Sequence, residues 1–251
     1  MAVDVSERDG VVYLRVAAPA GIGPAAERLA WAIADACAAI DEREAPPVGV
    51  AIVGAGGAYC VLPPRSAAEC DALGAAWAAA TAAVGRLGPP TLAVIGGDAV
   101  GPAWELALAC DLRIATDGAR LGSPEVRWGR LPAAGGTQRL TRLAGPAVAL
   151  RLLLLGEVLA APEALGLGLV HRVGPAEGLE AAQEELLEAL RAGAPIALGY
   201  AKEAVRQGLE LPLAAGLRLE ADLAALLQTT RDRAEGLAAF AARRAPRYEA
   251  R

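Results

Sequence analysis

The order of extended and helical segments changes along this chain of 251 residues. Up to about residue 145, short apolar segments (10–17, 48–53, 92–95, 112–115) alternate with helical ones (24–40 and 67–86). Strands that alternate with helices at this spacing need crossover connections and predict a mostly parallel sheet. After residue 145 only 169–173 is predicted to be extended, and the segments with helical spacing are 146–155, 176–192, 195–208, 212–228 and 231–244. The sequence therefore predicts an α/β core followed by a helical C-terminal region.

Composition excludes several classes of partner. The net charge is −5 and the pI is about 5.1, so the overall field attracts neither a nucleic-acid backbone nor an anionic membrane surface. The longest uncharged run, 45–64, holds four prolines and four glycines and cannot form a spanning helix. The N-terminus lacks the apolar segment of a signal peptide. No C-x-x-C pair occurs among the four cysteines, so we expect reduced thiols, no metal and a cytoplasmic protein.

Two glutamates, Glu105 and Glu125, are the candidate catalytic residues. Glu105 opens the helical run 105–111 just after the turn signal Gly101-Pro102, and Glu125 follows a short strand and a turn. An acid at a helix start and another at the end of a loop can converge in space, as general acid/base catalysis requires. The alternative is that both are ordinary acids that stabilise a helix N-terminus.

The sequence motifs around these glutamates resemble those of the enoyl-CoA hydratase/isomerase (crotonase) family. They include ELALACDLRIA from Glu105 and SPEVRWGRLPAAGGTQRL from Ser123. Further matches are LGE at 155–157, GLV at 168–170, AKE at 201–203 and TRDR at 230–233. The resemblance covers nearly the whole chain and is densest over residues 90–168.

This resemblance implies a spiral of ββα units, with residues 1–194 as the α/β core and residues 195–251 as a helical oligomerisation region. It implies a homotrimer or a dimer of trimers, an acyl-CoA thioester as substrate and no separate cofactor. Glu105 matches the glutamate that activates water in the hydratases, and Glu125 matches the one that moves a proton at the α-carbon. Isomerases of the family generally keep only the later glutamate, so the pair favours hydration.

Two prolines depart from the family pattern. The family holds the enolate oxygen with two backbone N–H groups, and the matching positions here are Pro63 and Pro102. Proline has no N–H to donate, and the loss of one such donor typically costs roughly 10²–10³ in rate. Leu62, Ala103 and Trp104 flank these prolines and are predicted to contact the substrate, with Leu62 and Ala103 as the remaining candidate donors.

A third departure is the stretch 17–24, where the family has charged and amide side chains that hold the adenine end of CoA and this chain has none. Two hypotheses follow. The first is a hydratase or isomerase that uses Glu105 and Glu125 and a rebuilt oxyanion site. The second is a catalytically impaired paralogue that serves as a subunit or binding partner.

Overall fold

The computed structural model describes residues 3–17, 24–55 and 67–251. Within them a six-stranded sheet has the order β1-β2-β3-β4-β6-β9, and a three-stranded sheet has the order β5-β7-β8. The larger sheet is parallel except for the antiparallel hairpin β1–β2. In the smaller one β5 and β7 run parallel, while β7 and β8 run antiparallel.

The strands of the larger sheet are β1 (Val3–Arg8), β2 (Val11–Ala17), β3 (Gly49–Ala55), β4 (Thr91–Ile95), β6 (Leu112–Thr116) and β9 (Arg172–Gly174). Those of the smaller sheet are β5 (Ala99–Val100), β7 (Arg120–Gly122) and β8 (Val158–Ala160). The first helices are α1 (Pro24–Asp41), α2 (Ala67–Arg86), α3 (Pro102–Ala109), the 3₁₀ helix η1 (Glu125–Trp128) and α4 (Gly136–Leu155). They are followed by α5 (Ala161–Gly166), η2 (Ala176–Gly178), α6 (Leu179–Arg191), α7 (Pro195–Gly208), α8 (Leu213–Leu227) and α9 (Arg231–Ala241).

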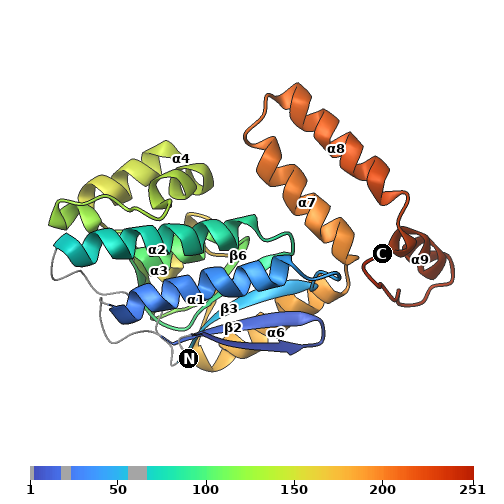
Figure 1. The fold of residues 1–251 in the computed structure, drawn as a ribbon, viewed down its shortest axis with the longest axis horizontal. Helices are drawn as coiled ribbons and strands as arrows, with labels where there is room; N and C mark the ends of the chain where they lie inside the picture. The colour runs from blue at the N-terminus through green and yellow to red at the C-terminus, as the bar shows by residue number, and fades with distance from the viewer. Residues whose placement is uncertain (1–2, 18–23, 56–66) are drawn as a thin grey trace.

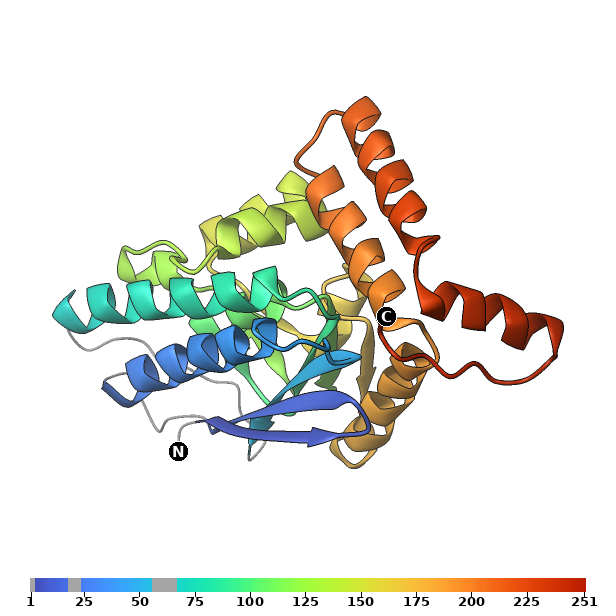
Figure 2. The same cartoon turned by 45° about the vertical axis from the view of Figure 1, so that its right-hand side comes forward.

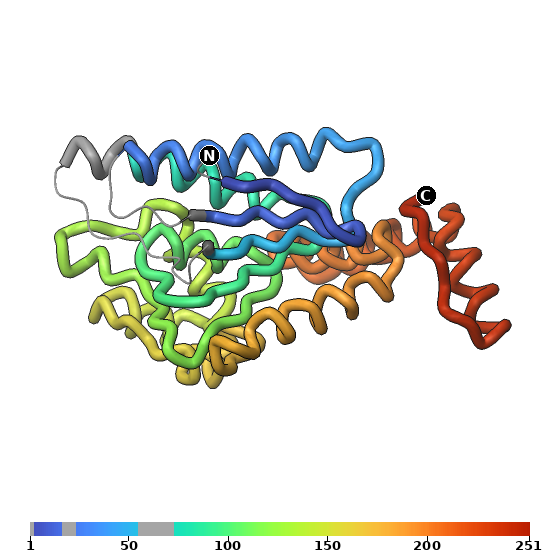
Figure 3. The backbone as a smooth tube through the Cα atoms, turned by 90° about the horizontal axis from the view of Figure 1, so that it is seen from below, coloured from blue at the N-terminus to red at the C-terminus, as the bar shows by residue number. Residues whose placement is uncertain are grey.

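Helices cover both faces of the larger sheet, and its inner strands, such as β4, are apolar on both sides for this reason. Alternate residues such as Leu14 and Ile52 pack in the main core with α1, α2 and α3. Their neighbours, such as Tyr13 and Ala51, face α6 in a second cluster around Leu187. Figure 3 shows α1 and α6 on opposite sides of the strands.

The helices α7, α8 and α9 extend away from this layered core. Figures 1 and 2 show α7 and α8 as an antiparallel pair, with α9 projecting beyond them. No residue of α7 is fully buried, and large apolar side chains along these helices are exposed. They are Val205, Leu209, Leu213, Leu217, Leu226, Leu237 and Phe240. None of the described helices is long and apolar enough to cross a membrane.

The predicted order of elements is largely confirmed, with four corrections. Helix α3 begins at Pro102, so Glu105 lies in its first turn rather than opening the helix. Helix α4 begins at Gly136, ten residues before the predicted start, and is broken at Gly145, where φ is 79°. The strand expected at 169–173 is displaced to Arg172–Gly174, and the helix expected over 231–244 ends at Ala241. The hairpin strand β1 and the short strands β5, β7 and β8 were not predicted. The predicted boundary at residue 195 coincides with the start of α7, and the division into two domains stays a prediction.

Candidate active site

Helix α3 places the first glutamate through an unusual N-terminus. Its cap, Gly101, has φ 69° and ψ −135°, a conformation that a residue with a side chain rarely adopts. The Gly101 N–H donates to the Gly122 carbonyl at 2.8 Å, which fixes the turn against β7. Pro102 then occupies the first helical position, where its fixed φ suits the helix. Glu105 follows one turn later, and its N–H donates to Gly101 at 3.1 Å.

The Glu105 side chain is almost completely buried, with 1% of its surface exposed. Its Oε1 accepts two backbone hydrogen bonds, from Ala134 N–H at 2.9 Å and from Gly136 N–H at 2.7 Å. Burial disfavours the charged carboxylate and raises its pKa to about 7, although the two N–H donors act in the opposite direction. The carboxyl is thus able to exchange a proton near neutral pH.

The Gly135-Gly136 pair of the GGTQRL motif explains how the Glu105 side chain fits against the start of α4. Gly135 caps α4 with φ 96°, in the left-handed region. A Cβ on Gly136 would lie 2.9 Å from Glu105 Oε1 and 3.0 Å from its Cγ. Gly136 therefore leaves room for the carboxylate and also donates to it.

Glu125 begins η1, and 5% of its surface is exposed. Neither carboxylate oxygen has a hydrogen-bond partner among the described residues. Burial raises the pKa of Glu125. The backbone amide of Glu125 and the charge of Arg130 lower this pKa, but by less than burial raises it. A buried polar group without a partner is costly, so this carboxyl is arranged to stay protonated or to meet a ligand.

The two glutamates lie near one another, since the charge of Glu125 also raises the pKa of Glu105. Their surroundings differ: Glu105 has two N–H donors, which favour its charged form, and Glu125 has none. Two nearby carboxyls with unequal environments are the arrangement that acid/base catalysis uses.

The comparisons with known proteins identify the family. A family profile described as enoyl-CoA hydratase/isomerase matches residues 68–251. The chain belongs to the enoyl-CoA hydratase/isomerase family. It is 41% identical over 162 residues to the 2,3-dehydroadipyl-CoA hydratase of Escherichia coli, a match that covers 64% of each chain. It is 46% identical over 160 residues to the Bacillus subtilis protein YngF, described as a putative enoyl-CoA hydratase/isomerase, covering 64% of this chain and 62% of that protein.

Solved structures of this family share the fold over the full length. The enoyl-CoA hydratase of Bacillus anthracis superposes with a TM-score of 0.91 at 30% identity, and the match covers 100% of both chains. The subunit I structure from Geobacillus kaustophilus gives a TM-score of 0.87 at 31% identity. These matches confirm the predicted crotonase-like α/β fold with a helical C-terminal region.

Pro102, at the first position of α3, has no backbone N–H to donate. The next two residues, Ala103 and Trp104, have side chains that pack in the main core, 2% and 1% exposed. Their backbone N–H groups belong to the first turn, where no carbonyl of the helix itself can accept them. Any contact of Ala103 or Trp104 with a ligand would thus be made by the backbone.

Several predicted positions lie outside the described residues. They are Pro63, Leu62 and residues 18–23 of the stretch 17–24. The structure also adds groups that the sequence did not single out. Ala134 and Gly136 hold Glu105 by their N–H groups. Ser123, two residues before Glu125, has a buried Oγ that meets no hydrogen-bond partner in the described part of the chain. The repeated glycine of GGTQRL was the only sequence signal for this contact. His171 accepts from Arg113 N–H at 3.1 Å through Nδ1.

Proposed function

We propose that this protein is an enoyl-CoA hydratase/isomerase-like enzyme that acts on an acyl-CoA thioester with Glu105 and Glu125 as an acid/base pair. The observation that carries the proposal is the pair of buried, neighbouring carboxyls with raised pKa. Family membership and relatives described as hydratases support the same reaction class.

In the proposed hydration, Glu105 takes a proton from water while the oxygen of that water bonds to the β-carbon. Glu125, held protonated, supplies a proton to the α-carbon. The environments fit this division, because two N–H donors favour an ionised Glu105 and the unpartnered Glu125 favours its neutral form. Microscopic reversibility exchanges the two roles in dehydration.

The thioester oxygen gathers negative charge in this reaction and needs N–H donors. At the start of α3 the donor cannot come from Pro102, and we assign it to the N–H of Ala103, supported by the α3 dipole. A donor displaced by one residue is not aligned as well as the family's own. We therefore expect turnover at least ~10³-fold below that of an ordinary family hydratase.

A second candidate is a catalytically impaired paralogue that works as a subunit or binding partner. Pro102 favours it, since an N–H is missing where the reaction needs one. The altered stretch 17–24 favours it as well.

Hydration of crotonyl-CoA, followed by the loss of the conjugated enoyl absorbance, tests the proposal together with calorimetry of CoA and acetoacetyl-CoA. Slow hydration with binding at micromolar to millimolar concentration supports the enzyme. CoA binding without turnover supports the impaired paralogue. If the protein neither binds CoA nor hydrates crotonyl-CoA, an acyl-CoA thioester is excluded both as its substrate and as its ligand.

We also propose that the protein is a homotrimer or a dimer of trimers. The exposed apolar side chains of α7, α8 and α9 support this, because a monomer would leave them in water. Light scattering at micromolar concentration is the test, and a stable monomer would overturn it.

A further inference from the structure

The other end of α3 opens onto a cleft that the glutamate pair does not use. The cleft has a volume of about 740 Å³ and lies between α2, the end of α3, α4 and α7. Its inner wall includes Pro90 and Leu112, which precede and begin the strands β4 and β6. An adjoining cavity of about 520 Å³ shares Arg86, Lys202 and Arg206 with it. Because α3 has eight residues, about 12 Å of helix separates this cleft from the N-terminus of α3.

Positive charge is concentrated in this cleft, although the whole chain carries −5. Five basic residues line it against two carboxylates, Asp111 and Glu210, which leaves a local excess of three positive charges (5 − 2 = 3). The basic residues are Arg86, Arg139, Arg142, Lys202 and Arg206. In the adjoining cavity Glu203 is the one further carboxylate among the described lining residues, and it accepts from Gln207.

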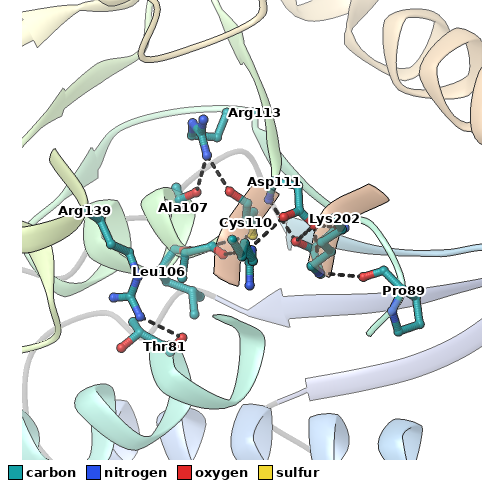
Figure 4. A network of polar contacts seen from close by, with 12 residues as sticks. Thr81, Pro89, Leu106, Ala107, Cys110, Asp111, Arg113, Arg139 and Lys202 are labelled. Carbon is teal, nitrogen blue, oxygen red and sulfur yellow. Dashed lines mark hydrogen bonds and ion pairs between the residues drawn. The ribbon is translucent and has the colours of Figure 1, made fainter. Parts of the chain in front are cut away.

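Asp111 already binds two of these cations. Its Oδ2 lies 2.8 Å from Lys202 Nζ, and its Oδ1 lies 2.8 Å from Arg206 Nη2. Lys202 also donates to the Pro89 carbonyl at 2.7 Å, and Figure 4 shows it between Asp111 and Pro89. These two cations therefore have structural partners and attach α7 to the core.

Arg86 and Arg139 form no ion pair with the described residues, although the charge of Glu105 acts on Arg139. Arg139 donates to the Ala134 carbonyl at 2.7 Å and to the Thr81 carbonyl at 3.3 Å, and Figure 4 shows the second of these bonds. Arg86, at the end of α2, is exposed and makes no hydrogen bond or ion pair with the described residues. It lines both cavities. Arg142 forms an ion pair with the exposed Glu210 at 3.2 Å and donates to the Gln138 side-chain oxygen, also at 3.2 Å.

The cations also repel one another. Burial lowers the pKa of Lys202 and of Arg139, and the charge of Arg206 lowers both further. An anion in the cleft would relieve this repulsion and pair with guanidinium groups that line it, Arg86 first.

We propose that the cleft between α2, α4 and α7 is a binding site for a small phosphate-bearing anion. Guanidinium groups bind phosphate oxygens through paired N–H donors, and Arg86 and Arg142, two of the lining arginines, are open to solvent. The volume lies within the range of small-molecule sites, roughly 300–1,000 Å³. The proposal does not depend on the hydratase function, because none of the residues that carry it belongs to the glutamate site.

Calorimetry with pyrophosphate, at constant ionic strength set with sodium chloride, tests the site. We expect Arg86→Gln and Arg142→Gln each to weaken binding about 10-fold, as the loss of a charge-assisted hydrogen bond does. Arg86 has no partner to lose, so its replacement leaves the fold intact. Arg218→Gln is the matched control, because Arg218 is an exposed arginine of α8 without an ion pair among the described residues. Its affinity should equal that of the unmodified protein.

Competition by CoA distinguishes the source of the phosphate. Displacement of pyrophosphate by CoA would assign the site to a phosphate group of that molecule, and its absence would assign the site to a separate anion. No binding at about 10 mM, or equal binding by Arg86→Gln and the unmodified protein, overturns the proposal. A smaller assembly of Arg86→Gln in light scattering, with no change in pyrophosphate affinity, also overturns it and makes the cleft a contact between copies.

Discussion

Ionisable groups of opposite sign are buried at the two ends of helix α3. The free-energy cost of burying their charge is met differently at each end. At the N-terminal end, burial raises the pKa of Glu105 to about 7, and the nearby Glu125 carboxylate has no hydrogen-bond partner among residues 3–17, 24–55 and 67–251. At the C-terminal end, the cations stay charged because Asp111 and backbone carbonyls receive them. One end is arranged to exchange protons, whereas the other is arranged to hold charge.

This difference follows from what each end can supply. The N-terminal N–H groups of a helix stabilise negative charge and the C-terminal carbonyls stabilise positive charge. Arg206 donates to the Ala109 carbonyl at 3.0 Å, and Arg113 donates to the Cys110 carbonyl at 2.5 Å, so cations already occupy carbonyls at the C-terminal end. At the N-terminal end Pro102 removes one donor, and the N–H groups of Ala103 and Trp104 find no acceptor within α3 itself.

The largest expected effect concerns the proton-exchanging end. Glu105→Gln and Glu125→Gln should each lower any crotonyl-CoA hydration by roughly 10²–10⁴, because an amide neither accepts nor supplies the required proton. Initial rates measure the effect, and thermal melts check the fold. Glu180→Gln, at an exposed glutamate in the first turn of α6, is the matched control and should keep full activity. Undiminished turnover in either variant would show that the reaction does not use this pair.

The next prediction restores the missing donors. Pro102→Gly combined with Pro63→Gly should raise the rate by roughly 10²–10³, because each returns a backbone N–H to the position where the family holds the thioester oxygen. The glycines cost some helix stability, about 1 kcal/mol at position 102. Pro162→Gly, in the first turn of α5, is the control for that loss and should leave the rate unchanged. If the double variant is no faster, Pro102 is not what limits turnover.

The sequence singled out Glu105 and Glu125 as candidates, but it did not predict the groups that contact them. The local sequence motifs that resemble the family singled out Glu105 and Glu125. The periodicity of apolar residues predicted long helices such as α1 and α2. The N–H groups that hold Glu105 come from 29 and 31 residues further on, a contact that no local pattern reveals. The strands β5, β7 and β8 have only two or three residues, too few for a period to be seen. The basic cleft collects residues from positions 86 to 206 and exists only after folding.

A third prediction concerns the charge-holding end. Asp111→Asn removes the carboxylate that binds Lys202 and Arg206 and should lower the free energy of unfolding by about 3–4 kcal/mol, since it leaves the Lys202 charge, 8% exposed, without its partner. Asp98→Asn is the matched control. Asp98 pairs at 2.6 Å with Arg120, which is 68% exposed, and its loss should cost about 0.5 kcal/mol. Urea unfolding at one protein concentration measures both. Equal losses in the two variants would mean that Asp111 does not anchor α7.

The smallest effect expected is the pH dependence of stability that Glu105 causes. Burial raises the pKa of Glu105 from 4.5 to about 7, so the folded state binds this proton more tightly than the unfolded state. Its stabilising contribution is complete below pH 4.5 and is lost as the pH rises through about 7, and the total change is at most roughly 3 kcal/mol. Urea unfolding of Glu105→Gln between pH 4.5 and 8 should therefore give a flatter profile than the unmodified protein. A Lys202→Met profile should keep the fall over this range, because Lys202, though its pKa is lowered by burial, is held charged by Asp111. If the unmodified protein gains stability from pH 4.5 to 7 and Glu105→Gln gains as much, Glu105 is ionised throughout, and the contrast between the two ends of α3 is wrong.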